Sequence, residues 1–190
     1  MTKNDLPDRD GLPEHLKVLL DDHPRAGWSD HQHFSDLTKF WLNRHLMFRK
    51  ALETLQFESN YFLEGARDPQ RFAALIAKVG GFFISELHTH HHMEDQYYFP
   101  LLIQQDERLK AGFDLLDSDH HQLAELLDRM GNSGNDLVNK IHAKSEASMF
   151  AAQHLQNILN RFDRFMDRHL SDEEELIVPI ILEYNPQITL

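Results

Sequence analysis

Large apolar residues recur every seven positions in four separate stretches of this sequence. In the first stretch, Phe34, Trp41, Phe48 and Leu55 keep this spacing. Two turns of an α-helix take close to seven residues, so side chains with this spacing share one helical face. No segment shows the alternation of apolar and polar residues, bounded by hairpin dipeptides, that is typical of strands. The pattern predicts an all-α protein with four amphipathic helices.

Capping and helix-breaking residues place the first two helices. Residues 1–30 contain several prolines and glycines, so we expect a capping arm that packs on the surface. The first helix is predicted over residues 31–57. The second begins at Asp68 and Pro69, because aspartate caps a helix and proline fits its first position. It should end or kink near Pro100, where an amide hydrogen is lost.

The last two helices follow a glycine and a polar segment. Gly112 is expected to break the chain before the third helix. Residues 131–136, Gly-Asn-Ser-Gly-Asn-Asp, are predicted to form a loop. The fourth helix then starts at Asp136 or near Ser145 and ends at Pro179. Four such helices with short connections favour an antiparallel up-down four-helix bundle.

One histidine interrupts the apolar row of each predicted helix. These histidines are His45, His90, His120 and His169. A single core histidine is usually satisfied by one hydrogen bond. Four imidazoles that face one another in an apolar interior are costly to bury, unless a metal ion accepts their lone pairs. The four positions therefore predict a metal site.

A glutamate follows two of these histidines by four residues, Glu94 after His90 and Glu173 after His169. Four residues make about one helical turn, so each pair shares a face, and a buried carboxylate also needs a cation. In both segments a proline follows the glutamate by six residues, and an apolar triplet follows the proline. This repeat suggests two similar helix pairs, which would build a site for two metals rather than one.

The ligands of such a site are nitrogen and oxygen atoms, because the chain has no cysteine. Imidazoles and bridging carboxylates can hold two ions and leave positions for small ligands. Such sites suit iron, manganese or zinc, and we expect two iron ions. His91 points within about 100° of the core face of its helix, so it is a candidate for a further ligand.

Charge and length restrict the partners. A net charge of −12 opposes binding to nucleic acid and to anionic membranes. No apolar run approaches the length of a membrane span, so we expect a cytoplasmic protein. With 190 residues, the chain suits one domain over residues 31–190, preceded by the arm over residues 1–30. The oligomeric state stays open.

The residues of the predicted site resemble those of a known family, the hemerythrin-like proteins with the His-His-Glu cation-binding domain. The resemblance covers about residues 34–182. Its motifs are His45, His90-x-x-x-Glu94 before Phe99-Pro100, Asp119-His120-x-x-Leu123, and His169-x-x-x-Glu173 before Pro179. The resemblance implies an up-down four-helix bundle with a non-haem di-iron centre, in which the four histidines are terminal ligands and the two glutamates are bridges. It also implies reversible interaction with oxygen, another small diatomic molecule or peroxide.

The sequence departs from the pattern of oxygen-carrying hemerythrins at two places. Those proteins have a second histidine one turn after the first in the third helix, where this chain has Ala124. They also have an aspartate five residues after the histidine of the fourth helix, whereas Glu173 and Glu174 stand here at four and five. The terminal ligand set is therefore thinner than that of an oxygen carrier.

Three functions remain open. The one we expect is a metal-binding module that binds or senses oxygen, nitric oxide or peroxide, or that holds iron. The second is a di-iron enzyme that reduces peroxide or nitric oxide. The third is a metal-free helical interaction protein with structural histidines.

Ordinary roles are expected for other polar residues. Asp119, which precedes His120, either orients a metal ligand as a hydrogen-bond acceptor or is an acid favoured near the start of a helix. The acidic run over residues 172–175 should be solvated, apart from Glu173. The histidines expected outside the metal site are His15, His23, His31, His33, His88, His92, His121, His142 and His154.

Overall fold

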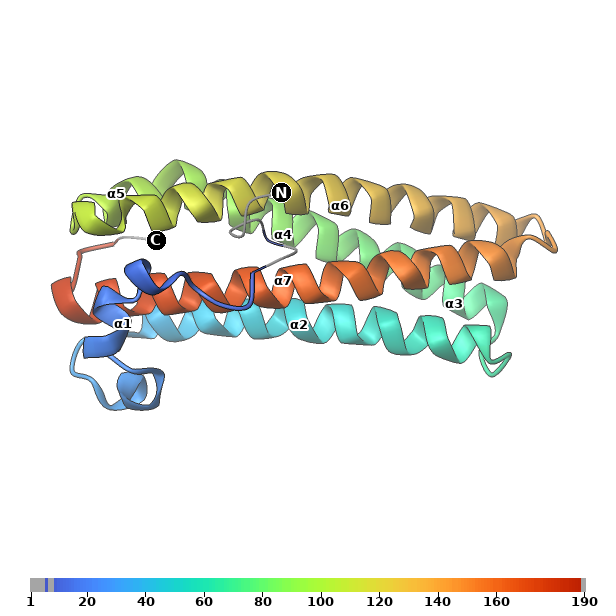
Figure 1. The fold of residues 1–190 in the computed structure, drawn as a ribbon. Helices are drawn as coiled ribbons and strands as arrows, with labels where there is room; N and C mark the ends of the chain where they lie inside the picture. Colours follow the sequence, from blue (N-terminus) through green and yellow to red (C-terminus); the bar gives the residue numbers. More distant parts are fainter. Residues whose placement is uncertain (1–5, 7–8, 189–190) are drawn as a thin grey trace. The chain divides into compact units, whose positions relative to one another are not determined.

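The computed structural model describes residue 6 and residues 9–188. Helices account for all the regular structure in this part of the chain, which confirms the all-α prediction. The three longest helices are α2 (Asp36–Leu63), α6 (Lys110–His142) and α7 (Ser148–Tyr184) (Figure 1). The chain divides into two compact units. Unit 1 comprises Met1–Leu46, His90–Gln122 and Phe165–Leu190, and unit 2 comprises Met47–Thr89 and Leu123–Arg164.

The helical stretch between α2 and α6 is built from several short elements. They are α3 (Pro69–Leu75), the π-helical turn η4 (Ile76–Gly80), α4 (Gly81–Met93), the π-helical turn η5 (Glu94–Tyr98), α5 (Phe99–Ile103) and the 3-10 turn η6 (Glu107–Leu109). The predicted start is confirmed, because the Asp68 side chain accepts a hydrogen bond of 2.9 Å from the Arg71 amide.

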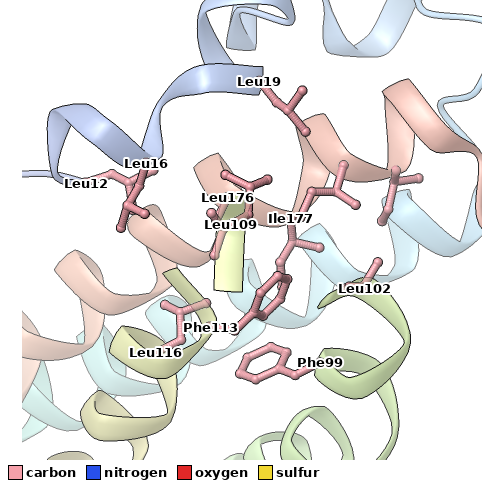
Figure 2. Close-up of a cluster of buried hydrophobic side chains, with 12 residues drawn as sticks. Leu12, Leu16, Leu19, Phe99, Leu102, Leu109, Phe113, Leu116, Leu176 and Ile177 are labelled. Carbon is pink, nitrogen blue, oxygen red and sulfur yellow. The ribbon is translucent and has the colours of Figure 1, made fainter. Parts of the chain in front are cut away.

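The N-terminal segment forms three short elements, η2 (Glu14–Leu16), α1 (Val18–Asp22) and η3 (Arg25–Asp30). Its leucines are more deeply buried than a surface arm requires. The hydrophobic cluster of unit 1 contains Leu12, Leu16 and Leu19 together with Phe99, Phe113 and Leu176 (Figure 2). The segment therefore supplies part of the core of unit 1.

The first long helix is shifted from its predicted range of 31–57. Helix α2 begins at Asp36, where the Ser35 hydroxyl accepts a hydrogen bond of 3.3 Å from the Thr38 amide. It continues to Leu63 and is followed by Gly65, which has a φ of 74°. Glycine adopts this left-handed conformation without steric cost, so it fits the end of a helix.

Pro179 does not end its helix, so this predicted end is wrong. Pro179 lies inside α7, which continues to Tyr184. Pro100 fits the prediction of an end or a kink nearby, because it lies in the short helix α5, which ends at Ile103 and directly follows the π-helical turn η5. The turns beyond Pro179 carry the buried Ile180 and Ile181. We infer that this burial outweighs the hydrogen bond that a proline cannot make.

The predicted break at Gly112 and the predicted loop at residues 131–136 are also wrong, because α6 passes through both. A Cβ atom at Gly112 would lie 2.7 Å from Leu176 Cδ2, so this glycine allows α6 and α7 to approach closely within unit 1. The connection before α7 lies at residues 143–147, where Lys144 has a φ of 52°. The fourth helix therefore starts near Ser145, at Ser148, and not at Asp136.

In unit 2, the glycines of the mispredicted loop pack against other helices. A Cβ atom at Gly131 would lie 3.4 Å from Ile84, and one at Gly134 would lie 3.4 Å from Ile76. Tertiary packing thus keeps this polar segment helical against the local preference of its residues.

Length and composition alone would allow one helical stretch, Pro69–Ile103, to cross a membrane. The same stretch carries His90, His91 and Glu94, whose side chains are buried among the helices of unit 1. We therefore interpret it as a core helix.

Candidate metal centre

The seven predicted ligands lie together in unit 1, and each is at most 6% exposed. They come from α2 (His45), α4 (His90 and His91), η5 (Glu94), α6 (His120) and α7 (His169 and Glu173). They form two groups, within each of which the potential ligand atoms lie within 4.8 Å of one another. The three-histidine group is His91, His120 and His169, and the mixed group is His45, His90, Glu94 and Glu173.

His90 and His91 are neighbours in the sequence but belong to different groups. Consecutive helical residues point about 100° apart, so one side chain can lie on each side of the inward direction. His90 Nε2 lies 3.2 Å from His45 Nε2, in the mixed group. The ring of His91 stacks on that of His120, with 4.0 Å between the ring centroids. His91 therefore completes the three-histidine group.

Glu94 lies between the two groups. Its Oε1 is 3.1 Å from His90 Nε2, and its Oε2 is 3.6 Å from His120 Nε2. The indole of Trp41 also donates a hydrogen bond of 2.8 Å to Oε1. The two oxygens of one carboxylate thus face histidines of different groups.

Glu173 repeats this arrangement from α7. Its Oε1 is 3.4 Å from His45 Nε2, in the mixed group, and its Oε2 is 3.4 Å from His169 Nε2, in the three-histidine group. Both glutamates therefore have the placement that a carboxylate needs to bridge two cations.

Three of the histidines have carboxylate partners on the ring nitrogen that faces away from the groups. His45 Nδ1 lies 3.0 Å from Glu174 Oε1, His120 Nδ1 lies 2.7 Å from Asp95 Oδ1, and His169 Nδ1 lies 3.4 Å from Asp119 Oδ2. A carboxylate in this position holds the Nδ1 proton, so the Nε2 lone pair points inward. Such partners orient an imidazole for metal binding.

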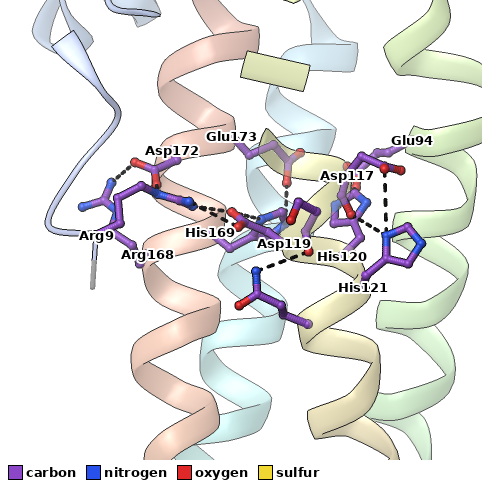
Figure 3. A network of polar contacts seen from close by, with 12 residues as sticks. Arg9, Glu94, Asp117, Asp119, His120, His121, Arg168, His169, Asp172 and Glu173 are labelled. Carbon is purple, nitrogen blue, oxygen red and sulfur yellow. Dashed lines mark hydrogen bonds and ion pairs between the residues drawn. The ribbon is translucent and has the colours of Figure 1, made fainter. Parts of the chain in front are cut away.

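The prediction that the acidic run over residues 172–175 is solvated, apart from Glu173, is wrong at Asp172 and Glu174. Asp172 and Glu174 are buried, with exposed fractions of 0% and 5%. Arginines of the N-terminal segment pair with both: Arg9 Nε lies 2.7 Å from Asp172, and Arg25 Nη1 lies 2.7 Å from Glu174 (Figure 3 shows the Arg9 pair). The run is covered because partners distant in the sequence pack against it.

Of the two roles predicted for Asp119, the structure supports that of orienting a ligand, and this ligand is His169. The interpretation as an acid at a helix start does not hold, because α6 begins at Lys110 and Asp119 is only 1% exposed. The partner of His120 is Asp95, which the sequence analysis missed. Its position directly after Glu94 was the available signal.

Trp41 was also missed as a polar partner, because its place in an apolar row hid its indole N–H. Among the described residues, both groups consist of the seven predicted side chains and include none of the other histidines.

Several inward atoms have no hydrogen-bond partner in the described part of the chain. They are His91 Nε2, His120 Nε2, His169 Nε2, Glu94 Oε2 and both oxygens of Glu173. Buried polar atoms are nearly always paired, because an unpaired one costs about 1–3 kcal/mol. Six such atoms at one place fit a cation-binding centre, since cations use the same lone pairs.

The family sequence model described as the Hemerythrin HHE cation binding domain matches residues 36–142. The chain belongs to this family. The matched part of the hemerythrin domain contains His45, His90, His91, Glu94 and His120. His169 and Glu173 follow the matched part, and the structure brings them together with the other five side chains. Comparisons with curated proteins and with solved structures found no match.

The ionisable groups of this hemerythrin domain influence one another strongly. Burial alone would lower the pKa of His169, but its contacts with Asp119 and Glu173 raise that pKa to about 9. Burial alone would raise the pKa of Glu173, but His45 and His169 hold it well below the ordinary value. Burial and the neighbouring Glu173 raise the pKa of Glu94 well above its ordinary value.

The pKa values of His90 and His91 are well below the ordinary range, chiefly because of burial. In the metal-free site these shifts favour the ionised form of Glu173 and the protonated form of Glu94. Two bound cations would favour two ionised glutamates and release protons.

Proposed function

We propose that this hemerythrin domain binds a pair of metal ions, with iron as the resident metal and manganese or zinc as alternatives. The three-histidine group would hold one ion and His45 with His90 the other, with Glu94 and Glu173 as bridges. One observation carries the proposal: the two oxygens of each glutamate face histidines of different groups. Imidazole and carboxylate ligands suit iron, manganese and zinc.

We also propose the fold that the family resemblance implies, an antiparallel up-down four-helix bundle with an N-terminal capping segment. In support of it, α2, α4, α6 and α7 each contribute a histidine to the site in unit 1. The net charge of −12 supports the further proposal that the protein binds neither nucleic acid nor anionic membranes. A cytoplasmic location is also part of the proposal.

The proposed role is that of a module that binds or senses oxygen, nitric oxide or peroxide, or that stores iron. A bound metal pair supplies positions at which such small molecules can coordinate. The chain fixes the imidazoles through Glu174, Asp95 and Asp119, and it surrounds the site with buried side chains. Such a rigid and shielded site suits binding of a small ligand.

A specific observation also supports the second candidate, an enzyme that reduces peroxide or nitric oxide. Such an enzyme needs a route by which electrons enter. Trp41 donates a hydrogen bond to Glu94, and its ring centroid lies 6.3 Å from that of the half-buried Tyr98. These two rings form a possible path from the surface to a ligand.

The binding proposal is tested by loading the metal-free protein with Fe²⁺ without air and measuring iron per chain by elemental analysis. We expect two ions in the wild type and His142→Ala, because His142 is exposed and lies in unit 2. His169→Ala and Glu173→Ala should each lose iron sharply. Equal iron in all four proteins would contradict the assignment.

Steady-state assays with an added reductant separate the two roles. A module should give ligand-dependent spectral changes without continuous consumption of peroxide or nitric oxide. Sustained consumption that Tyr98→Phe slows, but that the exposed neighbour Tyr97→Phe leaves unchanged, would favour the enzyme.

A further inference from the structure

Arg9 is a buried arginine in the N-terminal segment, outside the residues that the family model matches. Its side chain is 2% exposed. Its Nε donates to Asp172 Oδ2 at 2.7 Å, and its Nη1 donates to Asp119 Oδ1 at 3.2 Å. Its Nη2 also donates to Asp119 Oδ2. One guanidinium thus holds a carboxylate of α6 and a carboxylate of α7 (Figure 3).

Both carboxylates are adjacent to proposed ligands. Asp119 precedes His120 in the sequence, and its Oδ2 lies 3.4 Å from His169 Nδ1. Asp172 precedes Glu173, and its Oδ1 lies 2.6 Å from Arg168 Nη2. The contacts of Arg9 therefore converge on the part of the site that contains the three-histidine group.

We propose that Arg9 is a positioning residue for the ion at the three-histidine group. It holds Asp119 where that carboxylate can accept from His169, and it fixes the ligand-bearing turns of α6 and α7 to each other. This inference rests on the proposed metal-binding function. It makes the N-terminal segment a functional part of the metal site.

The chemistry of arginine suits this task. A guanidinium is a planar fork with five N–H donors, so it can bind two carboxylates in a fixed geometry, whereas a lysine ammonium is a point charge on a flexible stem. Among the described residues, the ion-pair partners of the buried Asp119 are Arg9 and His169, so without Arg9 this carboxylate would keep His169 alone. Removing one partner of a buried pair is strongly destabilising, so the carboxylate should shift from its place.

Arg25 provides an internal comparison at the mixed group. Its Nη1 lies 2.7 Å from Glu174 Oε2, and Glu174 in turn contacts His45 Nδ1. The Arg25 side chain is 50% exposed, and its guanidinium lies over the Trp28 ring. Solvent screens an exposed pair, so Arg25 should have a weaker effect than Arg9. Loss of Arg25 should also affect the ion at the mixed group instead of the ion at the three-histidine group.

The experiment measures the affinity of both ions by Co²⁺ titration of the metal-free full-length chain, followed by visible absorption and chelator competition. Arg9→Met should lower the affinity for one of the two ions by about 10–100-fold, which is the usual effect of losing a group that orients a metal ligand. The second ion should keep its affinity and its absorption bands. The control Arg108→Met removes an exposed arginine that pairs with Asp106 and should change neither ion.

Ligand variants identify the weakened ion. His91→Ala disables the three-histidine group, so adding Arg9→Met should leave the remaining ion unchanged. His45→Ala disables the mixed group, so adding Arg9→Met should weaken the remaining ion. Arg9→Lys should fail to restore wild-type affinity, because it keeps the charge but loses the fork.

A second variant guards against a folding defect. Arg9→Met with Asp119→Asn removes one of the two carboxylate charges that Arg9 balances, and Asp172 keeps its pair with Arg168, so the chain should fold, as checked by circular dichroism. The same single ion should still be weakened. Wild-type affinity for both ions in Arg9→Met or in this double variant would overturn the inference, as would equal weakening of both. A wild type that binds no Co²⁺ would instead overturn the proposed function.

Discussion

In the seven-residue rows of the helices, unit 2 places aromatic side chains and unit 1 places imidazoles and carboxylates. Phe83 stands seven residues before His90, and Phe162 stands seven residues before His169. In unit 2 the ring of Phe83 contacts those of Phe48 and Phe162, with centroid distances of 6.2 and 5.6 Å. Two helical turns further along each row, unit 1 carries imidazoles and carboxylates instead.

The comparison separates stability from function. The aromatic layer of unit 2, formed by Phe48, Phe83 and Phe162, contributes stability by itself, because burial of apolar surface is favourable. The polar layer of unit 1 is costly to bury and needs cations to offset that cost. The same seven-residue spacing can therefore place either aromatic or polar side chains in the interior. The polar side chains indicate a function, because they are costly to bury without cations.

Metal removal should have the largest effect on the free energy of unfolding. Each ion should stabilise the fold by about 2.7 kcal/mol when its free concentration is a hundred times Kd, so a pair should contribute about 5 kcal/mol. Urea denaturation with and without a chelator measures this difference. His169→Ala with Glu173→Ala should no longer respond to the chelator. Unchanged stability of the wild type would contradict the cost assigned to the polar layer.

Phe83→Ala tests the aromatic layer of unit 2. Phe83 is fully buried, so the substitution should lower the free energy of unfolding of the metal-free protein by about 3–5 kcal/mol. Urea denaturation gives the loss, and elemental analysis of the folded variant should still find two ions. A Phe83→Ala protein that folds but binds no metal would show that metal binding in unit 1 also depends on the aromatic layer of unit 2.

Metal affinity should depend on pH in unit 1. In the metal-free site the pKa of His169 is about 9, so at pH 7 its imidazole is protonated and must release a proton to bind. Affinity should therefore fall about tenfold, or 1.4 kcal/mol, for each pH unit below that pKa. Calorimetric titrations in buffers of different ionisation enthalpy measure the proton release. Affinity that is constant between pH 6 and about 8 would contradict this charge assignment.

Two glycine substitutions should have opposite signs in the two units. A Cβ atom at Gly112 in unit 1 would lie 2.7 Å from Leu176, so Gly112→Ala should destabilise the protein by about 1–3 kcal/mol. A Cβ atom at Gly81 in unit 2 would have no atom within 4 Å among the described residues, so Gly81→Ala should stabilise the protein by up to about 1 kcal/mol. Thermal denaturation compares them, and equal signs would refute the packing role of Gly112.

The sequence predicted the features that depend on spacing within one helix. The heptad rows indicated helices, and the histidines in those rows, with Glu94, Glu173 and His91, are the residues that the structure brings together. This was possible because helical geometry converts spacing into a shared face.

Features that depend on partners distant in the sequence were not predicted. Pro179 and the segment 131–136 stay helical because other helices pack against them. Asp172 is buried because Arg9, 163 residues away, pairs with it. Local propensity carries no information about such partners, so only the three-dimensional structure reveals them.

Counting the metal ions bound to the purified chain tests the central claim most directly. Elemental analysis after anaerobic loading with Fe²⁺ and removal of free metal should find two ions per chain, and far fewer in His169→Ala and Glu173→Ala. A wild-type chain that retains no ion, or variants that retain as much as the wild type, would contradict it.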